Sequence, residues 1–161
     1  MKLSSRVLYG VRAMAELAGA YGSGPVSLGE VAEAERISFA YLEQLMAALR
    51  RAGLVESTRG MRGGYELARE PSAVTVGEIV RALEGPISLV ECASETDGAG
   101  RCERELTCAT RMVWQRMQDS ITKVLDSITL AELCRGSDTV GAPGRATPEG
   151  NSSAGGDACA S

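Results

Sequence analysis

Three of the five cysteines in the chain lie in one polar stretch, ECASETDGAGRCERELTC, at Cys92, Cys102 and Cys108. The residues between them are mostly glycine, serine, threonine and charged, and offer almost nothing apolar to bury. Cysteine is usually a buried residue, so thiols in a segment that cannot pack indicate chemistry. Thiolates bind iron–sulfur clusters and zinc, and exposed thiols can be oxidised.

The spacing Cys-x9-Cys-x5-Cys leaves several interpretations open. Structural zinc usually takes close pairs such as Cys-x2-Cys together with four protein ligands, and this stretch has no such pair. A disulfide switch needs no metal, and three thiols without a role are a further alternative. A glycine-rich loop is also flexible enough to wrap a preformed iron–sulfur core, whose binding would order a segment that cannot order itself.

The composition excludes several classes of protein. The chain has no histidine, which removes the commonest general base and a common metal ligand, so we expect no enzyme. The segment RGMRGG lacks the lysine and helix start of a phosphate-binding loop. No apolar run approaches the roughly 20 residues of a membrane span. Because Arg6, Arg12 and Glu16 interrupt the apolar N-terminus, it is no signal peptide, and we expect a cytoplasmic protein without a membrane.

The elements that position these cysteines are mainly helical. Apolar spacing predicts helices at 4–20 and 38–52, and capping-box spacing predicts helix starts at Ser27, Thr75 and Thr129. Two short β-type segments flank the glycine-rich tip of a hairpin within 54–67. A long helix at 110–127 carries a narrow apolar stripe. The stripe of the third helix comprises Phe39, Leu42, Leu45, Met46 and Leu49.

Three helices followed by a hairpin are the element order of a winged helix-turn-helix. We therefore predict a mainly α fold with a small β-hairpin wing, plus a long dimerisation helix. The expected organisation is a DNA-binding domain, a cysteine-containing loop, a dimerisation helix with a short terminal helix, and a disordered tail rich in Gly, Ser, Ala and Pro. Their ranges are 1–84, 85–109, 110–135 and 136–161.

The charge distribution favours nucleic acid locally. The net charge of the chain is −4, but residues 36–69 hold six arginines and three glutamates, which is +3. In a winged helix the N-terminal part of the third helix meets base edges, where Gln44 can pair with adenine and Glu43 can accept from cytosine. Arg59 at the wing tip can reach phosphates or the narrower minor groove. The alternative is a protein-interaction adaptor whose polar helix face is simply solvated.

Several motifs together resemble one family over roughly residues 1–134. They are MKLSSRVLYGVRAM, ISFAYLEQLMAALRRAGLVES, TRGMRGGYELARE, TVGEIVRALEG, the three cysteines and SITLAEL. They are similar to the bacterial winged-helix family of the iron–sulfur cluster regulator IscR, with NsrR and RirA. The resemblance implies a homodimeric transcription regulator that binds a pseudo-palindromic site in double-stranded promoter DNA. The DNA contacts that it implies are Ser38, Tyr41, Glu43 and Gln44 on the helix and Arg59, Gly63 and Gly64 at the wing.

The resemblance also implies an iron–sulfur cluster on Cys92, Cys102 and Cys108, 2Fe–2S in preference to 4Fe–4S, which would sense cluster status, redox state or nitric oxide. This chain departs from the relatives at the fourth ligand. Arg111 stands where the IscR type has histidine, and Leu8 stands where the NsrR type has aspartate. The candidates that remain are a partner residue, an exogenous ligand, or a side chain of this chain: Glu103, Glu105 or Cys134.

Overall fold

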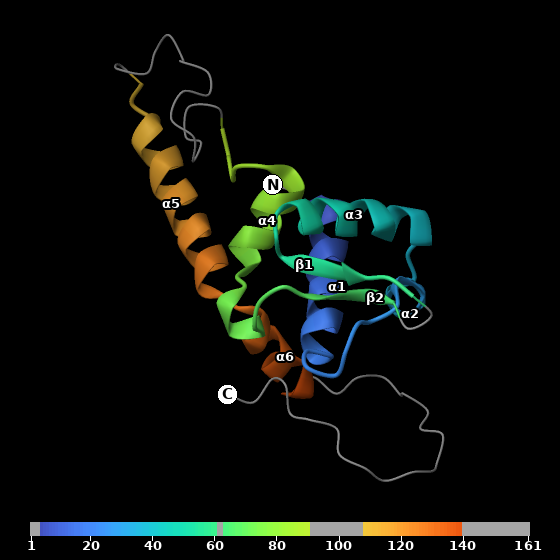
Figure 1. The fold of residues 1–161 in the computed structure, drawn as a ribbon. Coiled ribbons are helices and arrows are strands. Elements are labelled where there is room, and N and C mark those ends of the chain that lie inside the picture. The colour runs from blue at the N-terminus through green and yellow to red at the C-terminus, as the bar shows by residue number, and fades with distance from the viewer. Residues whose placement is uncertain (1–3, 61–62, 91–107, 140–161) are drawn as a thin grey trace.

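The computed structural model describes residues 4–60, 63–90 and 108–139. Within these ranges the chain forms helices, one short 3-10 turn and a two-stranded antiparallel hairpin (Figure 1). None of the helices in these ranges is long and apolar enough to cross a membrane. In chain order the elements are α1 (Ser5–Gly19), α2 (Leu28–Glu35), α3 (Phe39–Arg51), β1 (Val55–Thr58), β2 (Gly64–Leu67), η1 (Pro71–Ala73), α4 (Val76–Glu84), α5 (Arg111–Ser127) and α6 (Leu130–Thr139).

Hydroxyl side chains cap most of the helix starts that the sequence predicts. Ser4 accepts a hydrogen bond from the amide of Val7, and Thr75 forms a reciprocal capping box with Glu78. Ser27 caps α2 by accepting from the Gly29 amide at 3.2 Å, so it does so without the reciprocal Glu30 contact that the sequence predicts. These caps satisfy amides that have no partner within the helix.

One apolar core joins α1, α2, α3, α4 and α6. Met14, Leu42 and Leu45 are fully buried, and so is Leu130 at the start of α6. The last helix therefore returns from the end of α5 to pack beside α1 (Figure 1). It also continues past its expected end at Cys134 to Thr139.

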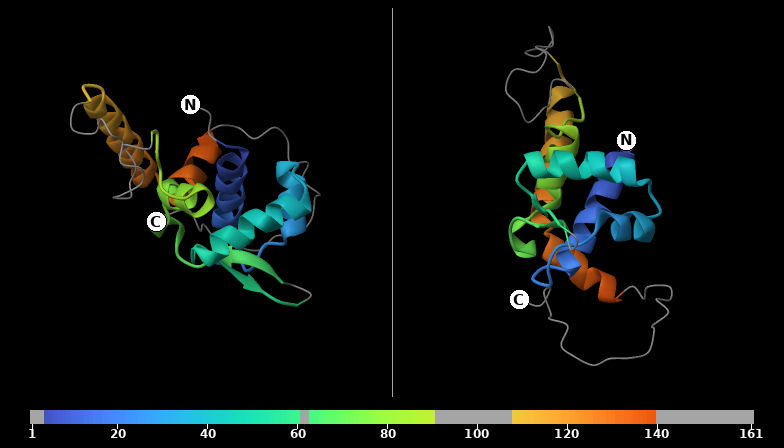
Figure 2. Two further views of the ribbon diagram at one scale, coloured as in Figure 1. Left: turned by 90° about the horizontal axis from the view of Figure 1, so that it is seen from above. Right: turned by 45° about the vertical axis from the view of Figure 1, so that its right-hand side comes forward.

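The wing lies beside α3 (Figures 1 and 2). Val55 pairs with Leu67 and Thr58 with Gly64 in antiparallel register. Val26, ahead of α2, bridges to Tyr65 through hydrogen bonds of 2.8 and 2.9 Å and so extends the pairing. The fold class is the predicted one, mainly helical with a two-stranded wing.

The helix α5 lies along α4 at one side of the molecule (Figure 1). Ile121, Leu125 and Ile128 pack against a second small cluster formed by Val7, Val76, Val80 and Ile87. Other large apolar side chains of α5 are exposed to solvent: Met112, Val113, Trp114, Met117 and Val124. The apolar stripe predicted for this helix is thus buried only in part.

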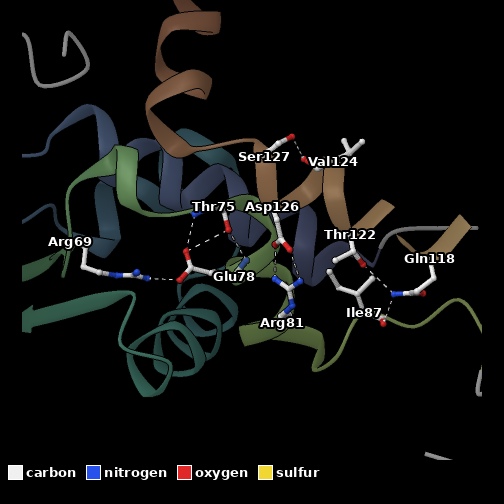
Figure 3. Close-up of polar contacts among 10 residues, drawn as sticks. All are labelled: Arg69, Thr75, Glu78, Arg81, Ile87, Gln118, Thr122, Val124, Asp126 and Ser127. Carbon is white, nitrogen blue, oxygen red and sulfur yellow. Dashed lines mark hydrogen bonds and ion pairs between the residues drawn. The ribbon is translucent and has the colours of Figure 1, made fainter. Parts of the chain in front are cut away.

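Polar contacts hold α5 on α4 (Figure 3). The Arg81 guanidinium donates to both carboxylate oxygens of Asp126, at 2.7 and 2.9 Å. This hydrogen bond, with the charge of Arg81, holds the pKa of Asp126 below its ordinary value. In the cap of α4, burial tends to raise the pKa of Glu78. Hydrogen bonds from the Thr75 amide and from Arg69 outweigh it and lower that pKa.

Candidate nucleic-acid interface and cysteine site

A tight turn sets α3 against α2. Arg36 adopts the left-handed conformation, with φ 54° and ψ 42°, and its amide donates to the Glu33 carbonyl. The amide of Ile37 donates to the Ala32 carbonyl at 3.0 Å. Ser38 then caps α3 by accepting from the Tyr41 amide at 3.3 Å. Ser38, a predicted DNA contact, therefore also has a structural role as the N-cap of α3.

The outer face of α3 presents four exposed side chains in its first two turns, those of Phe39, Ala40, Glu43 and Gln44. Tyr41, the other predicted contact on this helix, is half-buried. Its ring meets Tyr9 of α1 edge-on, with the ring centroids 6.2 Å apart. The structure thus brings Glu43 and Gln44 together on an open surface, and it turns Tyr41 partly towards the core.

Phe39 is not buried with the rest of the apolar stripe to which its spacing assigns it. Its side chain is 52% exposed, whereas Leu42, Leu45, Met46 and Leu49 of the same stripe are all at 0%. Phe39 is the first residue of α3, and the fully buried part of the helix begins only three residues later, at Leu42. Helical spacing places a residue on a face, but it carries no information about where the neighbouring elements end.

The wing brings Arg59 and two glycines beside α3. Arg59 is exposed in the turn after β1, and Arg50 of α3 donates to the Ser57 hydroxyl at 3.1 Å, which ties the helix to the wing. A Cβ atom on Gly63 would collide with the backbone of the hairpin, and one on Gly64 would collide with the backbone of Val26. Close backbone approach explains both glycines.

The cysteine site is described only at its C-terminal end. Cys92 and Cys102 lie outside the described residues, as do the candidate ligands Glu103 and Glu105. Cys108 is half-buried, two residues before the α5 cap Thr110, and its Sγ atom lies 3.2 Å from the Thr110 hydroxyl. Among the described residues no three Cys, Asp or Glu side chains form a metal-binding group.

Cys134 stands apart from this site. It lies on α6 and packs against the main core, whereas Cys108 precedes the opposite end of α5 (Figure 1). The 17 residues of α5 span about 25 Å at 1.5 Å per residue. Cys134 is therefore not a fourth ligand beside Cys108 of the same chain.

A buried three-helix core, an open third helix and a wing beside it define a winged-helix DNA-binding protein. A family model described as "Rrf2: Iron-dependent Transcriptional regulator" matches residues 3–136. The chain belongs to the Rrf2 family and is a DNA-binding transcriptional regulator, not an enzyme. This confirms the family and the class of function that the sequence motifs indicate.

Individual relatives match over most of their length. CymR of Bacillus subtilis is 47% identical over 133 residues, 83% of this chain and 89% of CymR. Its solved structure, described as that of the global cysteine regulator, superposes with a TM-score of 0.73 at 45% identity over 84% of this chain and 98% of that one. IscR of Escherichia coli is 37% identical over 145 residues, 90% of this chain and 87% of IscR. The structure of T. potens IscR has a TM-score of 0.71 at 43% identity over 89% of this chain and 94% of that one.

Proposed function

We propose that this chain is a cytoplasmic homodimer that binds a pseudo-palindromic promoter site, with its affinity or site choice controlled by an iron–sulfur cluster in the 92–108 loop. The observation that carries the DNA-reading part is the open face of α3 beside the wing. Glu43 and Gln44 present hydrogen-bonding groups on that face, and the Arg50–Ser57 contact holds the wing next to it. A protein-interaction adaptor would need no basic wing tip at this position.

The uncovered face of α5 supports the dimer. Val113, Met117 and Val124 are 53%, 45% and 56% exposed, and their spacing of four and seven residues puts them on one face. Ser120 completes the three- and four-residue steps of a coiled-coil seam. A second copy of the same helix fits this seam, and a two-fold dimer would place its recognition helices about 34–36 Å apart, one turn of DNA.

The oligomeric state tests this seam directly. We expect a dimer by sedimentation equilibrium, and we expect Met117→Glu to shift it towards monomer and to weaken binding to a two-half-site duplex. The matched control is Gln115→Glu, which adds the same charge on another exposed side of α5. A monomeric wild type, or equal dissociation of both variants, contradicts the proposal.

The donor chemistry of the 92–108 loop fits an iron–sulfur cluster. Thiolates are its standard ligands, and Cys92, Cys102 and Cys108 would supply three of them. The position of Cys108 ahead of α5 favours the thiolate form, because the N-terminal end of a helix dipole stabilises negative charge. We propose 2Fe–2S, with a fourth ligand from Glu103 or Glu105, from the partner chain or from a small molecule. The cluster would supply a redox-active, oxygen-sensitive centre, and an exchangeable fourth position would suit a sensor.

Anaerobic purification tests the cluster. We expect visible absorbance with matching iron and acid-labile sulfide, and we expect Cys108→Ser to lose most of it while Cys134→Ser keeps it. A cluster that survives prolonged oxygen and nitric oxide unchanged would contradict sensing. Colourless protein, with or without zinc, would contradict the cluster itself.

A metal-free thiol switch is the second candidate. The observation in its favour is the similarity to CymR, described as a global cysteine regulator. In that case metal-free protein would change its DNA affinity between oxidised and reduced forms, and Cys-to-Ser substitution in the loop would abolish the difference. Promoter binding that is indifferent to both oxidant and metal would contradict either form of control.

A further inference from the structure

We propose that Phe39 is a specificity-determining residue whose ring contacts the C5-methyl group of a thymine in the major groove. This inference rests on the proposed DNA-reading role of α3. It assigns Phe39 a direct contact with a base, in addition to the hydrogen-bonding side chains Glu43 and Gln44.

The core makes little use of the Phe39 ring. The side chain is 52% exposed at the first residue of α3, and the buried part of the helix begins at Leu42. Covering a large exposed apolar side chain with another molecule removes its surface from water, which lowers the free energy. A single exposed apolar residue is common, so its position on the molecule decides what covers it.

That position is among the candidate base readers. Phe39 lies one helical turn before Glu43, and residues four apart are neighbours on a helix surface. Ala40 and Gln44 form the adjacent exposed pair, also four apart. In this class of protein the first turns of the recognition helix meet base edges, so a DNA duplex that reaches Glu43 also faces Phe39.

The chemistry of the ring selects one base. In the major groove only thymine carries a methyl group, and apolar side chains such as phenylalanine contact it. The Ser38 cap, 3.3 Å from the Tyr41 amide, and the Ile37–Ala32 hydrogen bond of 3.0 Å fix the backbone on both sides of the start of α3. The ring is thus presented from a preorganised turn, which limits the entropy lost on binding.

Thymine-to-uracil replacement provides the test, because uracil lacks only the methyl group and pairs identically. A duplex bound by the protein is first selected from a random-sequence pool, and each thymine is then replaced in turn. We expect at least one thymine per half-site where uracil weakens wild-type binding about fourfold, the factor for one buried methyl group. Phe39→Ala should bind the thymine and uracil duplexes equally, and Phe39→Leu should keep part of the discrimination.

The matched control is Leu8→Ala, which removes an apolar side chain of similar exposure, 48%, from α1. Leu8→Ala should keep the wild-type preference for thymine, and circular dichroism should show that each variant is folded. If uracil has no effect on the wild type at any position, or if Phe39→Ala retains the same discrimination, the proposal is overturned while DNA binding stands. If no duplex is enriched at all, the proposed DNA reading fails, and this inference fails with it.

Discussion

The side-chain amide of Gln118 in α5 is hydrogen-bonded to the backbone of Ile87, in the segment that leads into the cysteine loop. Its Nε2 donates to the Ile87 carbonyl at 2.7 Å, and its Oε1 accepts from the Leu89 amide at 3.0 Å (Figure 3 shows the Ile87 contact). Gln118 is 5% exposed, the one buried polar side chain among the described residues. One side chain therefore joins the segment before the cysteine loop to α5, which follows the loop. A conformational change in the loop would act on α5 through this contact.

Replacing Gln118 by leucine should destabilise the fold. The Ile87 carbonyl and the Leu89 amide would lose their hydrogen bonds to Gln118, and loss of a partner at a buried polar group costs about 1–3 kcal/mol. Urea unfolding at fixed protein concentration measures the change. Gln115→Leu is the control, because Gln115 is exposed on the same helix. Equal stability of the two variants would show that the amide contributes nothing.

The Arg81–Asp126 pair should make stability depend on acid pH. The pKa of Asp126 is lowered in the folded state by the Arg81 hydrogen bond, so its contribution is present above the unfolded pKa of about 3.9 and is lost as pH falls through the lower folded value. Asp126→Asn should therefore lower the unfolding free energy at pH 7, and its difference from the wild type should shrink below about pH 4. A constant difference between Asp126→Asn and the wild type across pH 3 to 7 would contradict the assignment.

Gly77→Ala should destabilise the contact between α4 and α5, although alanine normally favours a helix over glycine. A Cβ at Gly77 would collide with the Asp126 carboxylate and lie 2.9 Å from a guanidinium nitrogen of Arg81. In an Asp126→Ala background the same change should be neutral or stabilising. Unfolding free energies of the four proteins give the coupling, expected at about 0.5–3 kcal/mol. Additive effects would mean that the ion pair does not require the glycine.

Arg59→Ala should weaken promoter binding sharply and reduce its salt dependence. Each lost phosphate contact lowers the slope of log affinity against log salt by about 1, or about 2 for a dimer. Fluorescence anisotropy across a salt series measures both effects. Arg135→Ala, which removes another exposed positive charge from α6, is the control. Unchanged affinity at moderate salt would rule out the wing contact.

Glu43→Ala should broaden the choice of promoter sequence. A carboxylate in the groove repels phosphate and tolerates only bases that offer a donor, and a good base contact discriminates by about 1–3 kcal/mol. Among promoter sequences that differ only at the base pair that Glu43 contacts, the spread of affinities should therefore shrink by about tenfold or more. Glu33→Ala on α2 is the charge-matched control. A panel whose ranking does not change would contradict the selectivity role.

Local patterns predicted much of this fold because their causes are local. The Thr75–Glu78 capping box, the ends of α3 and the two strands of the wing follow from spacing and from residue types that act within one or two turns. The exposure of Glu43 and Gln44, the predicted base contacts, follows from the same helical period. The family motifs added the class of function, which composition alone left open.

The sequence by itself determined the helices, the wing, the family and the three thiols of the loop. Only the tertiary structure decided what each apolar face meets, since burial depends on elements that are distant in the chain. Phe39 belongs to an apolar stripe by its spacing, and yet its side chain is 52% exposed. Leu130 is fully buried because α6 folds back onto α1. Gln118 is polar and yet buried. Its side-chain amide links α5 to the segment of Ile87, because it forms hydrogen bonds with the Ile87 carbonyl and the Leu89 amide.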